Sequence, residues 1–83
     1  MAIADEVRAV LGQTLQLGDR AKSFSEDTLL LGNLPELDSM AVATLVAAIE
    51  ENFGITIHDD EISAETFESV GTLTRFVAEK TAA

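Results

Sequence analysis

The sequence predicts an all-α protein: a small four-helix bundle with three main helices, one short helix, and a long ordered loop between helices one and two. Helical periodicity dominates the chain, and no repeat, low-complexity tract or linker divides it. The length of 83 residues and the apolar fraction of 47% suffice for one small domain, residues 1–83, with a core of its own.

The first helix carries its apolar residues on one face. These residues recur at helical spacing: Ile3, Val7, Val10, Leu11 and Leu15. Asp5 and Glu6 fall in the first turn, where the helix dipole favours negative charge. The pattern predicts a helix over this stretch with Gly18 as its stop.

A long segment without helical periodicity runs from Gly18 to Asp38. Six of its residues are large and apolar: Phe24, Leu29, Leu30, Leu31, Leu34 and Leu37. They are too many to leave in water, so we expect the loop to lie across the helices and plug one end of the bundle. Turn signals at Gly32-Asn33 and Pro35 break the segment just before the second helix.

The second helix is the most apolar of the three main helices. Its apolar positions follow helical spacing: Val42, Leu45, Val46, Ile49 and Phe53. Asp38 and Ser39 are both possible N-caps, and Gly54 is a suitable end. The pattern predicts a helix between these positions.

A short connector and a short helix separate the second helix from the last. The connector is apolar from Ile55 to Ile57, and residues 60–68 predict one or two helical turns pinned by Ile62 and Phe67. The last helix has apolar residues at helical spacing: Val70, Leu73, Phe76 and Val77. Ser69 is placed to cap it, and Lys80 lies in its last turn.

The charge of the chain is strongly negative and unevenly distributed. Fifteen acids and five bases give a net charge of −10, and no Lys or Arg lies between Lys22 and Arg75. That interval holds eleven acids: Glu26, Asp27, Glu36, Asp38, Glu50, Glu51, Asp59, Asp60, Glu61, Glu65 and Glu68. Such a surface repels nucleic acid and anionic membranes and attracts basic partners. A solvated surface kept for solubility is the alternative interpretation.

No feature of the sequence predicts export or membrane insertion. An acid pair stands where a secretory signal needs a basic flank, and the longest nearly apolar stretch, Met40 to Ile49, is too short to span a bilayer. The chain has no cysteine, which suits a reducing compartment. We expect a cytoplasmic monomer.

The residues that carry chemistry are few, which argues against an enzyme. His58 is the only histidine and has no cysteine partner, so neither a nucleophilic triad nor a His-rich metal site can form around it. Residues 58–61 are acidic but lack the alternating acids, the glycine and the terminal glutamate of a calcium loop. We therefore expect no metal site, and we interpret this run as a helix N-cap with a solvated acidic turn.

Ser39 stands out only through its context. The run Leu37-Asp38-Ser39-Met40, followed by an apolar helix and then by Glu50-Glu51-Asn52-Phe53-Gly54-Ile55, resembles the acyl carrier proteins. The resemblance covers most of the chain. In that family the serine of an Asp-Ser-Leu motif carries 4'-phosphopantetheine.

The resemblance implies that Ser39 is the covalent attachment site of 4'-phosphopantetheine. A separate phosphopantetheinyl transferase would supply the metal ion, coenzyme A and general base, and Asp38 would assist the modification. The thiol of the arm would then carry acyl groups as thioesters between enzymes of fatty acid, polyketide or specialised acyl pathways. Packing suggests a groove for the acyl chain, with five candidate residues: Leu45, Val46, Ile57, Ile62 and Phe67. Simple filling of the core is the alternative role for them.

The start of the second helix departs from the family pattern. Met40 replaces the usual leucine, and Ala41 and Thr44 stand where many carriers of fatty acid synthesis have acids. We therefore expect enzymes that transfer or activate acyl groups to be steered by acidic residues and then to contact Met40, Ala41 and Thr44. The steering residues are Glu36, Asp38, Glu50, Glu51 and the acids from Asp59 to Glu61. The alternatives are a peptidyl or aminoacyl carrier and an acidic helical interaction module without a prosthetic group.

Overall fold

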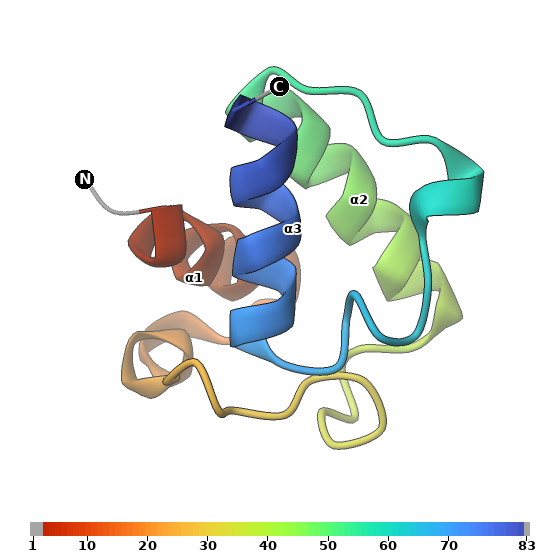
Figure 1. The fold of residues 1–83 in the computed structure, drawn as a ribbon. Coiled ribbons are helices and arrows are strands. Elements are labelled where there is room, and N and C mark those ends of the chain that lie inside the picture. Colours follow the sequence, from red (N-terminus) through yellow and green to blue (C-terminus); the bar gives the residue numbers. More distant parts are fainter. Residues whose placement is uncertain (1–2, 83) are drawn as a thin grey trace.

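The computed structural model describes residues 3–82 and confirms the all-α fold. Three α-helices form the body of the molecule, and two 3-10 helices lie in the connections between them (Figure 1). The elements follow in the order α1 (Ile3–Thr14), η1 (Gly18–Ser23), α2 (Ser39–Phe53), η2 (Asp59–Glu61) and α3 (Val70–Ala82). None of the helices in this range is long and apolar enough to cross a membrane.

The first helix ends earlier than the sequence suggests. Helix α1 stops at Thr14, and Gln16 adopts a left-handed backbone with a φ of 56°. The N–H of Leu17 bonds back to the carbonyl of Gly12 at 2.9 Å, which closes the end of the helix before Gly18 is reached. Gly18 instead opens η1, in a stretch for which the sequence predicts no helix.

Close packing against α1 explains the position of η1. Ala21 is buried, and a Cβ added to Gly12 would lie 3.1 Å from its side chain. A larger residue at position 12 would therefore push η1 away from α1. The apolar periodicity of the sequence does not reveal contacts of this kind. Part of the segment expected to be a loop is therefore a 3-10 helix.

The long loop does lie across the helices, and it is held by backbone pairing as well as by apolar contacts. Leu30 donates to the carbonyl of Glu68 at 2.8 Å and Leu31 to that of Phe67 at 3.0 Å. Leu30 and Leu37 are buried, whereas Leu29 stays 50% exposed, so the prediction that the apolar loop residues leave water holds only in part.

Helices α2 and α3 match the sequence patterns well. Gly54 ends α2 in a left-handed conformation with a φ of 65°, as its position predicts. The hydroxyl of Ser69 accepts the N–H of Thr72 at 3.2 Å and so caps the start of α3. The two helices and α1 share one core, to which each contributes three buried residues.

The short helix is smaller than expected. It is reduced to the single 3-10 turn η2, and residues 64–67 form turns instead of a helix. The hydroxyl of Ser63 accepts the N–H of Thr66 at 3.3 Å, a local bond that competes with helical pairing.

Candidate functional site

Ser39 is the first residue of α2, and its neighbour Asp38 is the N-cap. Asp38 has an extended backbone, and its Oδ1 accepts the N–H of Ala41 at 2.8 Å. The two possible caps are thereby resolved in favour of Asp38. Ser39 is exposed, and within residues 3–82 no hydrogen bond engages its hydroxyl. The hydroxyl is therefore available for chemistry at a helix N-terminus.

The surface of α2 that follows Ser39 is uncharged over its first turn. Met40 is 81% exposed, the most exposed large apolar side chain in the described part of the chain. The first turn of α2 contains no acidic residue, and the hydroxyl of Thr44 bonds to the carbonyl of Met40 at 3.1 Å. Ala41 is half-buried and Thr44 is exposed. These positions offer a partner a small apolar contact surface.

The carboxylate of Glu36 is already paired within the chain. Its Oε2 accepts a hydrogen bond from Arg20 of η1 at 2.7 Å. This bond from Arg20, reinforced by a backbone N–H, holds the pKa of Glu36 below its ordinary value. From the charge pattern of the sequence we expect Glu36 to steer partners. The role of Arg20 is not predicted, because nothing in the sequence indicates that these two residues meet.

Two more of the expected steering residues also have partners within the chain. Glu50 accepts the N–H of Ile57 at 2.7 Å, and Glu61 accepts the N–H of His58 at 2.9 Å. Lys80 of α3 donates to both carboxylate oxygens of Glu61, at 2.9 and 3.0 Å. The His58 N–H, and then Lys80, hold the pKa of Glu61 below its ordinary value. These carboxylates fasten the connector to the helices.

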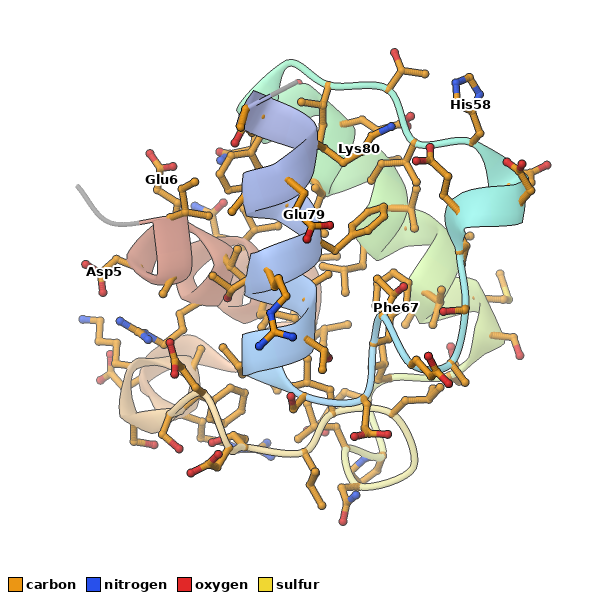
Figure 2. The ribbon with its side chains drawn as sticks, in the orientation of Figure 1. Asp5, Glu6, His58, Phe67, Glu79 and Lys80 are labelled. Carbon is orange, nitrogen blue, oxygen red and sulfur yellow. The ribbon has the colours of Figure 1, made fainter. Side chains whose placement is uncertain are left out.

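The remaining expected steering residues lie on the surface. Asp38, Glu51, Asp59 and Asp60 are exposed, and Asp38 uses one oxygen for the cap. His58 is exposed as well, and its side chain points away from the helices at the edge of the molecule (Figure 2). No cluster of metal-ligating side chains occurs among the residues that the structure describes.

The five candidates for an acyl groove fill the core in this structure. Leu45, Val46, Ile57 and Phe67 are buried and Ile62 is partly buried, and Phe67 is turned into the molecule (Figure 2). Three hollows on the described surface are lined by other residues, and the largest of these three, with a volume of about 550 Å³, lies between α1 and η1. An acyl chain would enter between these residues only after they move apart, so the groove stays a prediction.

Comparison with known proteins agrees with the geometry of the site. The family described as "Phosphopantetheine attachment site" matches residues 2–77. The acyl carrier protein of Wolinella succinogenes is 35% identical over 77 residues, which cover 93% of this chain and 95% of that protein. The acyl carrier protein of a Sulfurovum species is 37% identical over 78 residues, which cover 93% of this chain and 96% of that protein.

A solved structure resembles the chain over its whole length. The solution NMR structure of a holo acyl carrier protein from Nitrosomonas europaea is 47% identical, covers 100% of both chains and superposes with a TM-score of 0.92. The family match, the relatives and this fold agree with the exposed serine at the start of α2. The chain belongs to the acyl carrier protein family, as a non-catalytic carrier with a phosphopantetheine attachment site.

Proposed function

We propose that Ser39 bears 4'-phosphopantetheine and that the protein presents acyl groups, held as thioesters, to partner enzymes. The observation that carries this assignment is the exposed Ser39 hydroxyl, which has no hydrogen-bond partner among the described residues and stands at the first position of α2. Asp38 satisfies the N–H of Ala41, so the hydroxyl of Ser39 has no structural task.

The residues around Ser39 suit a phosphodiester. The N–H groups of Ser39 and Met40 have no acceptor within their own helix, since the first helical bond is that of Val42 to the carbonyl of Asp38 at 2.9 Å. These groups and the positive end of the helix dipole favour a phosphate despite the acidic chain. Once attached, the arm supplies the thiol that this cysteine-free chain lacks.

The transferase is the first partner that this proposal requires. It supplies the metal ion, coenzyme A and general base, while the chain supplies the serine hydroxyl, the Asp38 carboxylate and the apolar contact at Met40. The carboxylate of Asp38 keeps a second oxygen that the cap does not use, which leaves it able to assist the modification. The later partners are enzymes that transfer or activate acyl groups and have basic docking surfaces, and we assign the protein to the cytoplasm with them.

The uncharged start of α2 favours a specialised carrier over a general carrier of fatty acid synthesis. A partner that relies on acids at positions 41 and 44 would find Ala41 and Thr44 there. A peptidyl or aminoacyl carrier loaded by an adenylating enzyme fits this surface equally well. Loading assays with fatty acyl and aminoacyl substrates separate the two classes.

Modification of the apo protein tests the assignment of Ser39 directly. Incubation with coenzyme A, magnesium and a broad-specificity phosphopantetheinyl transferase should add one 4'-phosphopantetheine mass increment to the wild type and none to Ser39→Ala. The Ser39→Ala variant should change the free energy of unfolding by less than about 0.5 kcal/mol, because Asp38 provides the cap. Ser25→Ala is the control and should be modified normally. Retention of the increment in Ser39→Ala would exclude this serine, and its absence from the wild type would favour the interaction module.

A further inference from the structure

The loop that leads into Ser39 is fastened most firmly in its first half, where residues 26–31 make four backbone hydrogen bonds to residues 67–71, whereas the backbone N–H bonds of residues 33–37 stay within the loop. Leu30 and Leu37 are buried, and Leu37 donates its N–H to the carbonyl of Leu34 at 3.0 Å. Between Leu37 and the start of α2 stands only Asp38. Anything that fixes the chain at residue 36 therefore restricts the orientation of Asp38 and Ser39.

The ion pair of Glu36 and Arg20 is such a fixing point, and it joins residues 16 positions apart. Arg20 lies on η1, which packs against α1 through Ala21, so the guanidinium projects from an anchored element. In this pair, Nη1 of Arg20 lies 2.7 Å from Oε2 of Glu36. It thus connects the loop before α2 to the part of the molecule built on α1.

The carboxylate of Glu36 is turned toward the protein. The side chain of Glu36 is 32% exposed, and its Oε1 is buried without a hydrogen-bond partner in the described structure. Arg20 is more open, with 57% of its side chain exposed. A carboxylate with one oxygen bonded to Arg20 and the other covered offers little surface to a basic partner, although its lowered pKa keeps it charged.

We propose that Arg20 and Glu36 are positioning residues for the modification of Ser39. The ion pair holds residues 34–38 in the arrangement that presents Asp38 and Ser39 to the transferase, and it does not serve as a docking contact. This inference rests on the proposed function, since it presumes that Ser39 is the residue modified. Arg20 thereby acts on the site from a different element, η1, through the loop that it holds.

The positioning role and a docking role predict effects of opposite sign for Arg20. If Glu36 docked a basic enzyme, removal of Arg20 would expose its charge and increase the rate of association. If the pair positions the loop, loss of either partner lowers the fraction of molecules in the competent arrangement, and the apparent KM for the apo protein rises. Arg20→Gln and Glu36→Gln should then behave alike.

The test uses the full-length apo protein, a phosphopantetheinyl transferase and four variants. These are Arg20→Gln, Glu36→Gln, the charge-swapped double variant Arg20→Glu/Glu36→Arg, and the control Lys22→Gln. Lys22 lies on the same 3-10 helix and loses the same charge, but its ion pair in the described structure, with Asp19 at 3.4 Å, lies on an open surface. The measurements are kcat and KM for the apo protein at several salt concentrations, and amide hydrogen exchange of Leu37 and Ala41.

We expect both single variants to raise KM by up to about fivefold with kcat unchanged. A factor of this size corresponds to the free energy that one partly exposed ion pair contributes. Exchange at Leu37 and Ala41 should accelerate in parallel, the charge swap should restore both quantities, and Lys22→Gln should match the wild type. A lower KM in Arg20→Gln, or unchanged kinetics in both single variants, overturns the proposal. Failure of the wild type to be modified, or modification of Ser39→Ala, overturns the proposed function instead.

Discussion

Asp38 and Ser39 are adjacent in the sequence, but they have separate tasks. The carboxylate of Asp38 satisfies the N–H of Ala41 and starts the helix, while Ser39 lies within the first turn with an unengaged hydroxyl. A serine that capped the helix would have to give up that bond on modification. Placing the cap on the preceding residue allows Ser39 to react without loss of helix stability.

Two substitutions of Asp38 separate its structural task from its chemical task. Asp38→Asn should retain nearly full stability, because asparagine caps helices as well as aspartate does, yet it should slow modification through loss of the carboxylate. Asp38→Ala should lower the free energy of unfolding by about 1 kcal/mol as well. Urea denaturation and transferase kinetics on both variants provide the measurements. Equal modification rates for Asp38→Asn and the wild type would limit Asp38 to capping.

At the scale of elements, two carboxylates hold the first half of the connector between α2 and α3, residues 54–69. Glu50 of α2 binds the N–H of Ile57, and Glu61 of η2 binds the N–H of His58 and the ammonium group of Lys80. The connector is therefore bonded to α2 at Ile57 and to α3 at Glu61 through charged hydrogen bonds. Such a segment keeps its shape with only a single 3-10 turn of regular structure.

The bonds of Glu61 predict a stability that declines in acid. Its folded pKa lies below the ordinary value of 4.5, so Glu61 stabilises the fold above that pH, and the contribution is lost as the pH falls through the folded pKa. Glu61→Gln should be less stable than the wild type near neutral pH, and the difference should shrink below pH 4.5. Thermal unfolding at several pH values tests this, with Asp60→Asn as the control. A difference independent of pH would show that charge on Glu61 is unimportant.

At the scale of the whole molecule, acids dominate the middle of the chain while the bases lie on α1, η1 and α3. Of the eleven acids between Lys22 and Arg75, Glu36 and Glu61 pair with bases outside that interval. The unpaired acids repel one another in the folded state, and a domain of this size has little stability to offset that repulsion. The same field attracts basic partners over distances up to a Debye length of about 10 Å in 0.1 M salt.

The acidic field predicts two responses that a charge reversal on α2 can test. Salt and magnesium should raise the melting temperature, and Glu51→Lys should slow transferase association at low salt with little effect at high salt. Glu51 is the suitable site, because reversal of Glu50 would also break its bond to Ile57. Glu79→Lys on α3 changes the net charge equally and is the control. If the melting temperature did not respond to magnesium and Glu51→Lys associated with the transferase at the rate of the wild type, the acidic residues would serve only solubility.

The sequence by itself determines the three main helices, the end of α2 at Gly54, the cap at Ser69 and the resemblance that singles out Ser39. Each of these depends on residues close together in the chain: apolar periodicity, a glycine that accepts a positive φ, a hydroxyl three residues from its partner, and a short motif. Interactions between near neighbours leave patterns of short range in the sequence, and such patterns are sufficient to predict these features.

Only the tertiary structure decides which charged groups of different elements meet. Arg20 and Glu36 are 16 residues apart, and Glu61 and Lys80 are 19 residues apart, so no periodic pattern connects them. No periodic pattern connects Ala21 with Gly12 either, although their contact places η1 in the expected loop. The backbone bond between Leu30 and Glu68 is likewise absent from the sequence pattern. These contacts depend on how the helices pack, because packing brings residues that are distant in the sequence within bonding distance. Carboxylates that a count of charges would assign to partners are thereby bonded within the chain.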